Sequence, residues 1–299
     1  MSTRSRGPLA GFEWLKNGSS LGFHHPKSIF GGAAILLVAL LLPSLPTLLI
    51  QFHVLGAGTP QSATTLVGFM LIGVLLGLLI VPLYAGYLQI FDAAEHGLAA
   101  RALDIFKPYR QGEALRLIGY GLALIAIYIV MMGIIIAAAG GGIASWYMQV
   151  LAAQANHQLP PGLPHGFGIA MALLTVLGLF MMGLYSVSLG QVALRRRGVF
   201  NAIGDGLAGA LKNLLPLLVL AVSLILAWIV VSIALAIVVG LLALIGHFVG
   251  AWLMFVLVIP IYIALVLVIF TVMFGVMYYL WRDVCGDDST RGVDQAITA

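Results

Sequence analysis

Charged side chains are scarce in this 299-residue chain. Lys, Arg, Asp and Glu make up 8% of the residues, whereas hydrophobic residues make up 62%. A typical soluble domain is about 25% charged and about 45–50% apolar. So few charges could not keep a water-soluble fold of this length dispersed, and we therefore expect most of the protein surface to face lipid.

Cysteine and catalytic motifs are also lacking. Cys285 is the only cysteine, so no intramolecular disulfide is possible. The chain contains no Walker loop, nucleophile elbow, HExxH pair or CxxC pair, and we expect neither an enzyme nor a bound cofactor. The net charge of +4 does not indicate a nucleic-acid partner, because the basic residues flank long apolar runs, where they orient a membrane protein.

Six apolar runs are long enough to cross a bilayer, which needs about 20 helical residues. They cover about 29–50, 66–91, 117–138, 167–193, 214–245 and 249–281. A helix satisfies its own backbone hydrogen bonds in lipid, and the runs lack the alternation of about 10 residues that is typical of a barrel strand. The sequence therefore predicts an all-α fold, a polytopic transmembrane helical bundle that forms a single domain, 1–299.

The charges fall on one side of these spans. Residues 1–28, 92–116, 194–213 and 282–299 contain all 14 basic and all ten acidic residues. Residues 51–65, residues 139–166 and the turn expected near 246–248 contain none. Because excess Lys and Arg marks the cytoplasmic side, we expect an N-terminal segment (1–28) and a C-terminal tail (282–299) that are both cytoplasmic.

The loops after the second and fourth runs resemble each other. Three identities recur at an offset of 101 residues: Tyr84 and Tyr185, Gly97 and Gly198, Asp104 and Asp205. Each loop also carries an amphipathic segment with the spacing of a helix that lies in the interface plane. Their apolar sides are Leu98, Ala102, Ile105 and Phe106 in the first, and Val199, Ile203, Leu207 and Leu211 in the second.

The N-terminal segment with Phe12, Trp14 and Leu15 is a candidate third copy, and Gly286 a candidate end of the third unit. Three hairpins would then each follow an interfacial helix, as a parallel internal repeat. The alternative is that these few identities are coincidental. Small residues at helix-packing spacing are expected to let the spans of one chain approach one another, with a homo-oligomer interface as the alternative. They are Gly73 and Gly77, Gly133 and Ala137, and Ser232, Ala236 and Gly240.

This layout of interfacial segment, hairpin and glycine-containing inner loop resembles uncharacterised six-span bacterial inner-membrane proteins. It is also similar in plan to the membrane domain of some glycerophosphodiester phosphodiesterases. The resemblance covers most of the chain but rests on hydropathy, glycine placement and loop length. It implies an inner-membrane location and lipid association. It carries over no functional residue, because no phosphodiesterase motif is present.

Few side chains are candidates for a site. Arg195, Arg196 and Arg197 directly follow the fourth run. Each basic residue near an anionic membrane surface contributes about 1 kcal/mol, so the run is a candidate anionic-lipid contact. A topology anchor, which is compatible with a lipid contact, is the favoured interpretation.

Two other groups could carry chemistry. Imidazole binds zinc and copper, and four histidines fall in the uncharged outer segments: His53, His157, His165 and His247. Their spacing fixes no metal geometry, so interfacial polar residues without metal are the favoured interpretation. An intramembrane enzyme would have to use a group in the first inner loop: Asp92, Glu95, His96 and Asp104.

The favoured function is a lipid-associated scaffold or assembly partner without enzymatic activity. We expect membrane lipids as partners, and a homo-oligomer or another membrane protein as a further partner. The alternative is a transporter or flippase for an apolar or amphipathic solute, which the six-span repeat and the prolines within the spans would suit.

Overall fold

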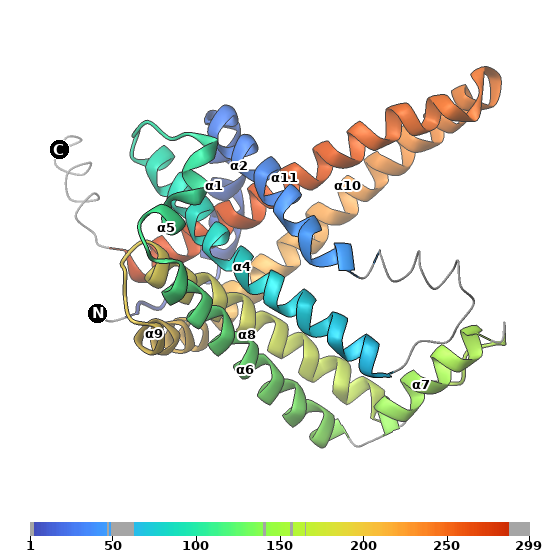
Figure 1. Ribbon diagram of the computed structural model, residues 1–299, viewed down its shortest axis with the longest axis horizontal. Helices are drawn as coiled ribbons and strands as arrows, with labels where there is room; N and C mark the ends of the chain where they lie inside the picture. Colours follow the sequence, from blue (N-terminus) through green and yellow to red (C-terminus); the bar gives the residue numbers. More distant parts are fainter. Residues whose placement is uncertain are drawn as a thin grey trace.

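The computed structural model describes residues 3–46, 48, 63–139, 142–155, 158–164 and 166–286, and helices dominate this part of the chain (Figure 1). The elements are α1 (Ala10–His24), α2 (Pro26–Leu41), η1 (Leu42–Ser44), α4 (Ala63–Glu95), η2 (Ala102–Phe106), α5 (Lys107–Arg110), α6 (Ala114–Ala139), α7 (Gly142–Ala155), α8 (Phe167–Ala193), α9 (Val199–Lys212), α10 (Leu214–Val249) and α11 (Ala251–Cys285).

Within the described residues, six helical segments are long and apolar enough to cross a membrane. They are α2 with η1, α4, α6, α8, α10 and α11, which confirms the predicted polytopic bundle. α8 has the predicted bounds, whereas α4 and α11 continue past their predicted ends to Glu95 and Cys285. The added turns persist because neighbouring elements bury them: Ala94 is 3% exposed and Val284 is fully buried.

The segments expected on the outer side hold one prediction that is wrong and one helix that the sequence analysis did not predict. The turn between the last two spans lies at Gly250 rather than at 246–248, because α10 continues to Val249. Gly250 adopts a φ of 128°, which a residue with a Cβ rarely adopts. In addition, α7 occupies part of the outer segment 139–166, where no helix was expected.

The three hairpins α2–α4, α6–α8 and α10–α11 meet at one end and separate toward the other (Figure 1). We call the meeting point the charged end; it contains Glu95, Ala193 and Cys285, the last residues of α4, α8 and α11. Away from it the spans have few protein neighbours, and none of the most apolar stretch of α10 is buried. Lipid is as apolar as these side chains and does not drive them together, so packing at the charged end holds the bundle.

Three short segments surround this end, and each packs against the second helix of one hairpin. The η2 segment lies against α4, and α9 lies against α8. α1 lies against α11, so the first helix of the chain closes the ring against the last. The N-terminal segment therefore takes the place predicted for a third copy.

Backbone-to-backbone contacts define the positions where these segments dock. A Cβ built on Gly86 of α4 would lie closer than 3.0 Å to the carbonyl of Ile105 in η2, and one on Gly275 of α11 would meet the backbone of Gly18 in α1 equally closely. In the α8–α9 pair the glycine is on the interfacial helix, where a Cβ on Gly206 would lie 2.7 Å from a carbonyl of α8. Close approach at the charged end thus depends on glycine.

The glycines predicted to pack the spans do not have this role. A Cβ on Gly77, Gly133 or Gly240 would meet no atom within 4 Å, and one on Gly73 would make only an ordinary contact of 3.6 Å. The spacing of these residues is the one expected for helix packing, but they lie on the parts of the spans that have separated. That prediction is therefore wrong for the described contacts.

The matched loop glycines also differ from one another. Gly97 has a φ of 66° and ends α4, with the Leu98 amide bonded to the Ala93 carbonyl at 2.9 Å, as in a glycine C-cap. Gly198 is instead the extended residue before α9, and Gly286 is also extended. After α8 the left-handed residue is Arg196, with a φ of 52°.

The start of the chain is tied into the same ring. The buried amide of Asn213 donates to the carbonyls of Arg4 and Gly209 at 2.9 and 2.8 Å, and its oxygen accepts from the Arg6 amide at 2.8 Å. The Arg4 amide donates to the carbonyl of Val284 at 3.0 Å. Residues before α1 thereby link the α9–α10 junction to the end of α11.

Candidate functional site at the charged end

Most described charges at this end pair with one another. The ion pairs are Arg6 with Asp283 (2.9 Å), Lys107 with Asp104 (3.7 Å), Arg116 with Glu113 (3.2 Å), Arg196 with Glu113 (2.8 Å), Arg197 with Asp205 (2.7 Å) and Arg282 with Glu95. All of them are partly exposed, so each one contributes little alone. Several of them join segments that are distant in sequence, so together they fix the arrangement of the loops.

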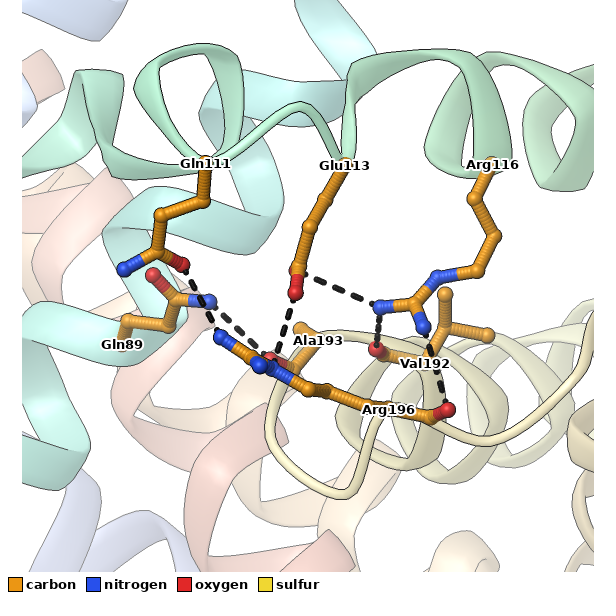
Figure 2. Close-up of polar contacts among 7 residues, drawn as sticks. All are labelled: Gln89, Gln111, Glu113, Arg116, Val192, Ala193 and Arg196. Carbon is orange, nitrogen blue, oxygen red and sulfur yellow. Dashed lines mark hydrogen bonds and ion pairs between the residues drawn. The ribbon is translucent and has the colours of Figure 1, made fainter.

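Glu113 is the centre of the best-defined cluster (Figure 2). Its carboxylate lies between the guanidinium groups of Arg116 on α6 and Arg196 after α8, and its side chain is only 11% exposed. Arg116 also donates to the carbonyls of Val192 at 3.1 Å and Arg196 at 3.0 Å. Gln89 of α4 donates to the Ala193 carbonyl at 3.0 Å. Three spans are thus joined around the turn that ends α8.

That turn contains the arginines predicted to contact anionic lipid. Arg196 and Arg197 have the carboxylate partners Glu113 and Asp205, and the guanidinium of Arg195 lies 5.9 Å from the centre of the Trp281 ring. The left-handed φ of Arg196 costs about 1–2 kcal/mol in a residue with a Cβ. These contacts offset that cost. A lipid contact of the three arginines stays a prediction, and the geometry shows that they stabilise the turn.

The acidic residues considered for an intramembrane enzyme are held by α11 or cap a helix. Asp92 accepts from the Tyr278 hydroxyl at 3.1 Å, and Glu95 accepts from Tyr279 at 2.5 Å and pairs with Arg282. His96 lies one turn from Asp92, at 3.6 Å from its carboxylate. Asp104 accepts from the Arg101 amide at 2.8 Å at the start of η2. Asp92 and Glu95 therefore join α4 to α11, and Asp104 caps η2.

The prediction about the outer histidines falls on residues or side chains that the structure does not describe. His53, His157 and His165 lie outside the described residues, and of His247 only the backbone, in α10, is described. Among the residues that the structure describes, no group of three or more His, Cys, Asp or Glu could hold a metal ion.

Some basic residues have no carboxylate partner among the described residues. No ion pair joins Lys16, Lys27, Arg101 or Arg110 to a carboxylate in the described part of the chain. All four are exposed. The sequence favoured the run of three arginines because consecutive charges stand out, whereas the cations left available to an anion are the isolated ones.

The three short segments that surround the charged end, α1, η2 and α9, also have large apolar side chains that are exposed. They are Leu9 (75%), Phe12 (55%) and Phe23 (62%) in and beside α1, Leu98 (65%) and Leu103 (59%) around η2, and Phe200 (85%), Leu207 (37%) and Leu211 (60%) on α9. The predicted apolar stripe of α9 is therefore divided: Ile203 is buried, but Leu207 and Leu211 face outward. Small residues such as Gly206 and Gly209 form the packed face, because they allow the close approach to α8.

An apolar groove of about 290 Å³ opens beside the η2–α5 segment. Ala39 of α2, Leu79 and Leu83 of α4, Phe106 of η2 and Tyr109 of α5 line it. None of the four candidate catalytic residues lines this groove. No sequence pattern indicated it, since its lining comes from five separate segments, α2, η1, α4, η2 and α5.

These features define a six-span helical membrane protein with a paired, closed charged end and an apolar groove beside it. No family model, curated protein or solved structure matches the chain.

Proposed function

We propose that this chain is a lipid-associated scaffold of the bacterial inner membrane, with its charged end and both termini in the cytoplasm. The orientation rests on the distribution of Lys and Arg, all of which belong to the charged-end segments. The inner membrane and the lipid association are also what the likeness to six-span inner-membrane proteins implies.

The exposed apolar side chains of the interfacial segments carry the proposal. Each segment buries one face against a span and still presents residues such as Phe12, Leu103 or Phe200 outward. A segment with this pattern lies in the interface and buries its free face among headgroups and acyl chains. Three of them around one end would hold the bundle at a fixed depth in one leaflet.

The paired charges favour a scaffold over an enzyme. Glu95 and Glu113 each join two elements, so the polar groups that could have formed a reactive centre have structural partners. Away from the charged end, the α10–α11 hairpin separates from the other spans (Figure 1) and exposes residues such as Trp228 and Ile237. That hairpin is the surface we propose for a second copy or another membrane protein.

A flipping assay separates the scaffold from the transporter or flippase. The purified protein is reconstituted in vesicles of phosphatidylethanolamine and phosphatidylglycerol that contain a fluorescent phospholipid, and dithionite then quenches the outer leaflet. A scaffold leaves about half of the fluorescence protected, as in protein-free vesicles, and retains phosphatidylglycerol in native mass spectrometry. Loss of the protected half would overturn the scaffold in favour of the flippase.

A further inference from the structure

We propose that the groove beside η2 and α5 binds one acyl chain of an anionic phospholipid from the same leaflet, with Arg110 at its phosphate. This inference deepens the proposed lipid association and rests on it. It assigns a defined lipid site to five segments that the sequence did not connect.

The groove has the chemistry of a hydrocarbon site. Its lining is apolar except for the Tyr109 hydroxyl, which donates to the carbonyl of Leu79. Burial raises the pKa of Tyr109 above its ordinary value, so the phenol stays protonated and remains a donor. Its acceptor lies in the turn that precedes Pro82 within α4. With its polar groups satisfied, the groove offers only apolar contacts.

The size and position of the groove suit a single chain. A dry apolar cavity of about 150 Å³ accommodates benzene, so a groove of about 290 Å³ holds a longer hydrocarbon segment. Leu79 on its wall is 49% exposed, so the groove opens sideways to lipid rather than to water. Its α4 wall extends from Leu76 to Leu83 within the apolar span, beyond Gly86, where η2 docks.

The cations at the groove give the preference for an anionic headgroup. Tyr109 lies between Pro108 and Arg110 in the single turn of α5, so Arg110 directly follows a lining residue. Its guanidinium donates to the Leu103 carbonyl at 3.3 Å and has no carboxylate partner among the described residues. Lys107 begins the same turn; its ammonium is 3.7 Å from the Asp104 carboxylate, and its side chain is 39% exposed. A guanidinium binds phosphate strongly because it can donate two parallel hydrogen bonds.

The test uses phosphatidylglycerol with a diazirine in the middle of one acyl chain. After photolysis in nanodiscs, mass spectrometry of peptides locates the crosslinks. We expect saturable labelling at Leu79, Leu83 and Phe106. Unlabelled phosphatidylglycerol should reduce this labelling by competition, and unlabelled phosphatidylcholine should not. Labelling spread evenly along α6, α10 and α11 without saturation would overturn the site, as would equal labelling by a phosphatidylcholine probe.

Two variants test the two halves of the site. Arg110→Gln should reduce labelling in the groove about fivefold, because a basic residue near an anionic surface contributes about 1 kcal/mol. Leu79→Phe should fill the groove and abolish that labelling; its partly exposed side chain leaves room for the larger ring. The matched controls are Lys16→Gln, another exposed and unpaired cation, and Leu122→Phe, which is exposed on α6 away from the groove.

If the Arg110→Gln variant is labelled as strongly as the wild type, Arg110 does not bind the phosphate. If the Leu79→Phe variant is labelled as strongly as the wild type, the groove does not hold the acyl chain. The flipping assay reports on the proposed scaffold independently. A protein that flips lipid but labels in the groove would contradict the scaffold alone, and one that neither flips lipid nor labels there would contradict the groove alone.

Discussion

Replacing Gly86 by alanine should destabilise the protein by about 2 kcal/mol. The new methyl group would meet the carbonyl of Ile105 closer than 3.0 Å, and η2 would have to leave α4. Overpacking typically costs about 1–3 kcal/mol, here with a backbone atom that no rotamer change can remove. The higher helix propensity of alanine, about 1 kcal/mol over glycine, offsets only part of this cost.

The native thiol reports this loss. Cys285 is 7% exposed at the charged end, so its rate of reaction with a maleimide in detergent measures how often that end opens. Gly86→Ala should raise the rate at least tenfold, whereas Gly133→Ala, where a Cβ meets no atom within 4 Å, should leave it unchanged or lower it. Equal rates for the two variants would show that η2 is not docked on α4.

Replacing Glu113 by glutamine should loosen the turn after α8. The variant leaves Arg116 and Arg196 without their shared carboxylate. Hydrogen bonds to charged groups contribute about 1.5–3 kcal/mol; because the Arg196 side chain is 64% exposed, solvent screens its share and we expect a loss of about 2 kcal/mol. The measurement is the thermal unfolding midpoint, together with the rate of trypsin cleavage after Arg195, Arg196 and Arg197.

Glu13→Gln is the control, since it removes an exposed carboxylate on α1 with no described ion pair. Its midpoint and cleavage rate should match those of the wild type. A lower midpoint in Glu113→Gln without faster cleavage of the turn would mean that Glu113 stabilises α6 rather than the turn. Wild-type behaviour in both assays would contradict the cluster drawn in Figure 2.

The spans were predictable because length and hydropathy determine them. The bounds of α8 follow from the apolar run alone, and the separation of charged from uncharged loops supports the number of spans. The plan of three interfacial segments was visible from two similar loops. Only the structure shows that α1 packs on α11 and closes the ring. No sequence pattern indicates a contact between segments that lie so far apart in the chain.

The close contacts were not predictable in the same way. A glycine at helix-packing spacing, such as Gly133, has the same local pattern whether a helix lies beside it or not, and here none does. The glycines that matter, Gly86 and Gly275, depend on where η2 and α1 dock. Likewise, three consecutive arginines carry no sign in the sequence that Glu113 and Asp205, from other segments, lie beside two of them.

The groove was missed for a related reason. Its residues are leucines and aromatics within apolar runs or next to them, where such residues are expected everywhere. Only the packing of η2 and α5 against α2 and α4 distinguishes them. Arg110 gave no signal either, because a single arginine in a charged loop looks like an orientation signal.

Cysteine labelling from the two sides of the membrane tests the central claim, that the charged end lies on one side and that three short segments surround it. Single cysteines replace Lys16, Leu98 and Asn201 at the charged end and Leu159 in the outer segment, all exposed, in a Cys285→Ala background. In spheroplasts, an impermeant maleimide should label only the Leu159→Cys protein, and the other three should react after the membrane is opened. Labelling of any of those three from outside would contradict the account.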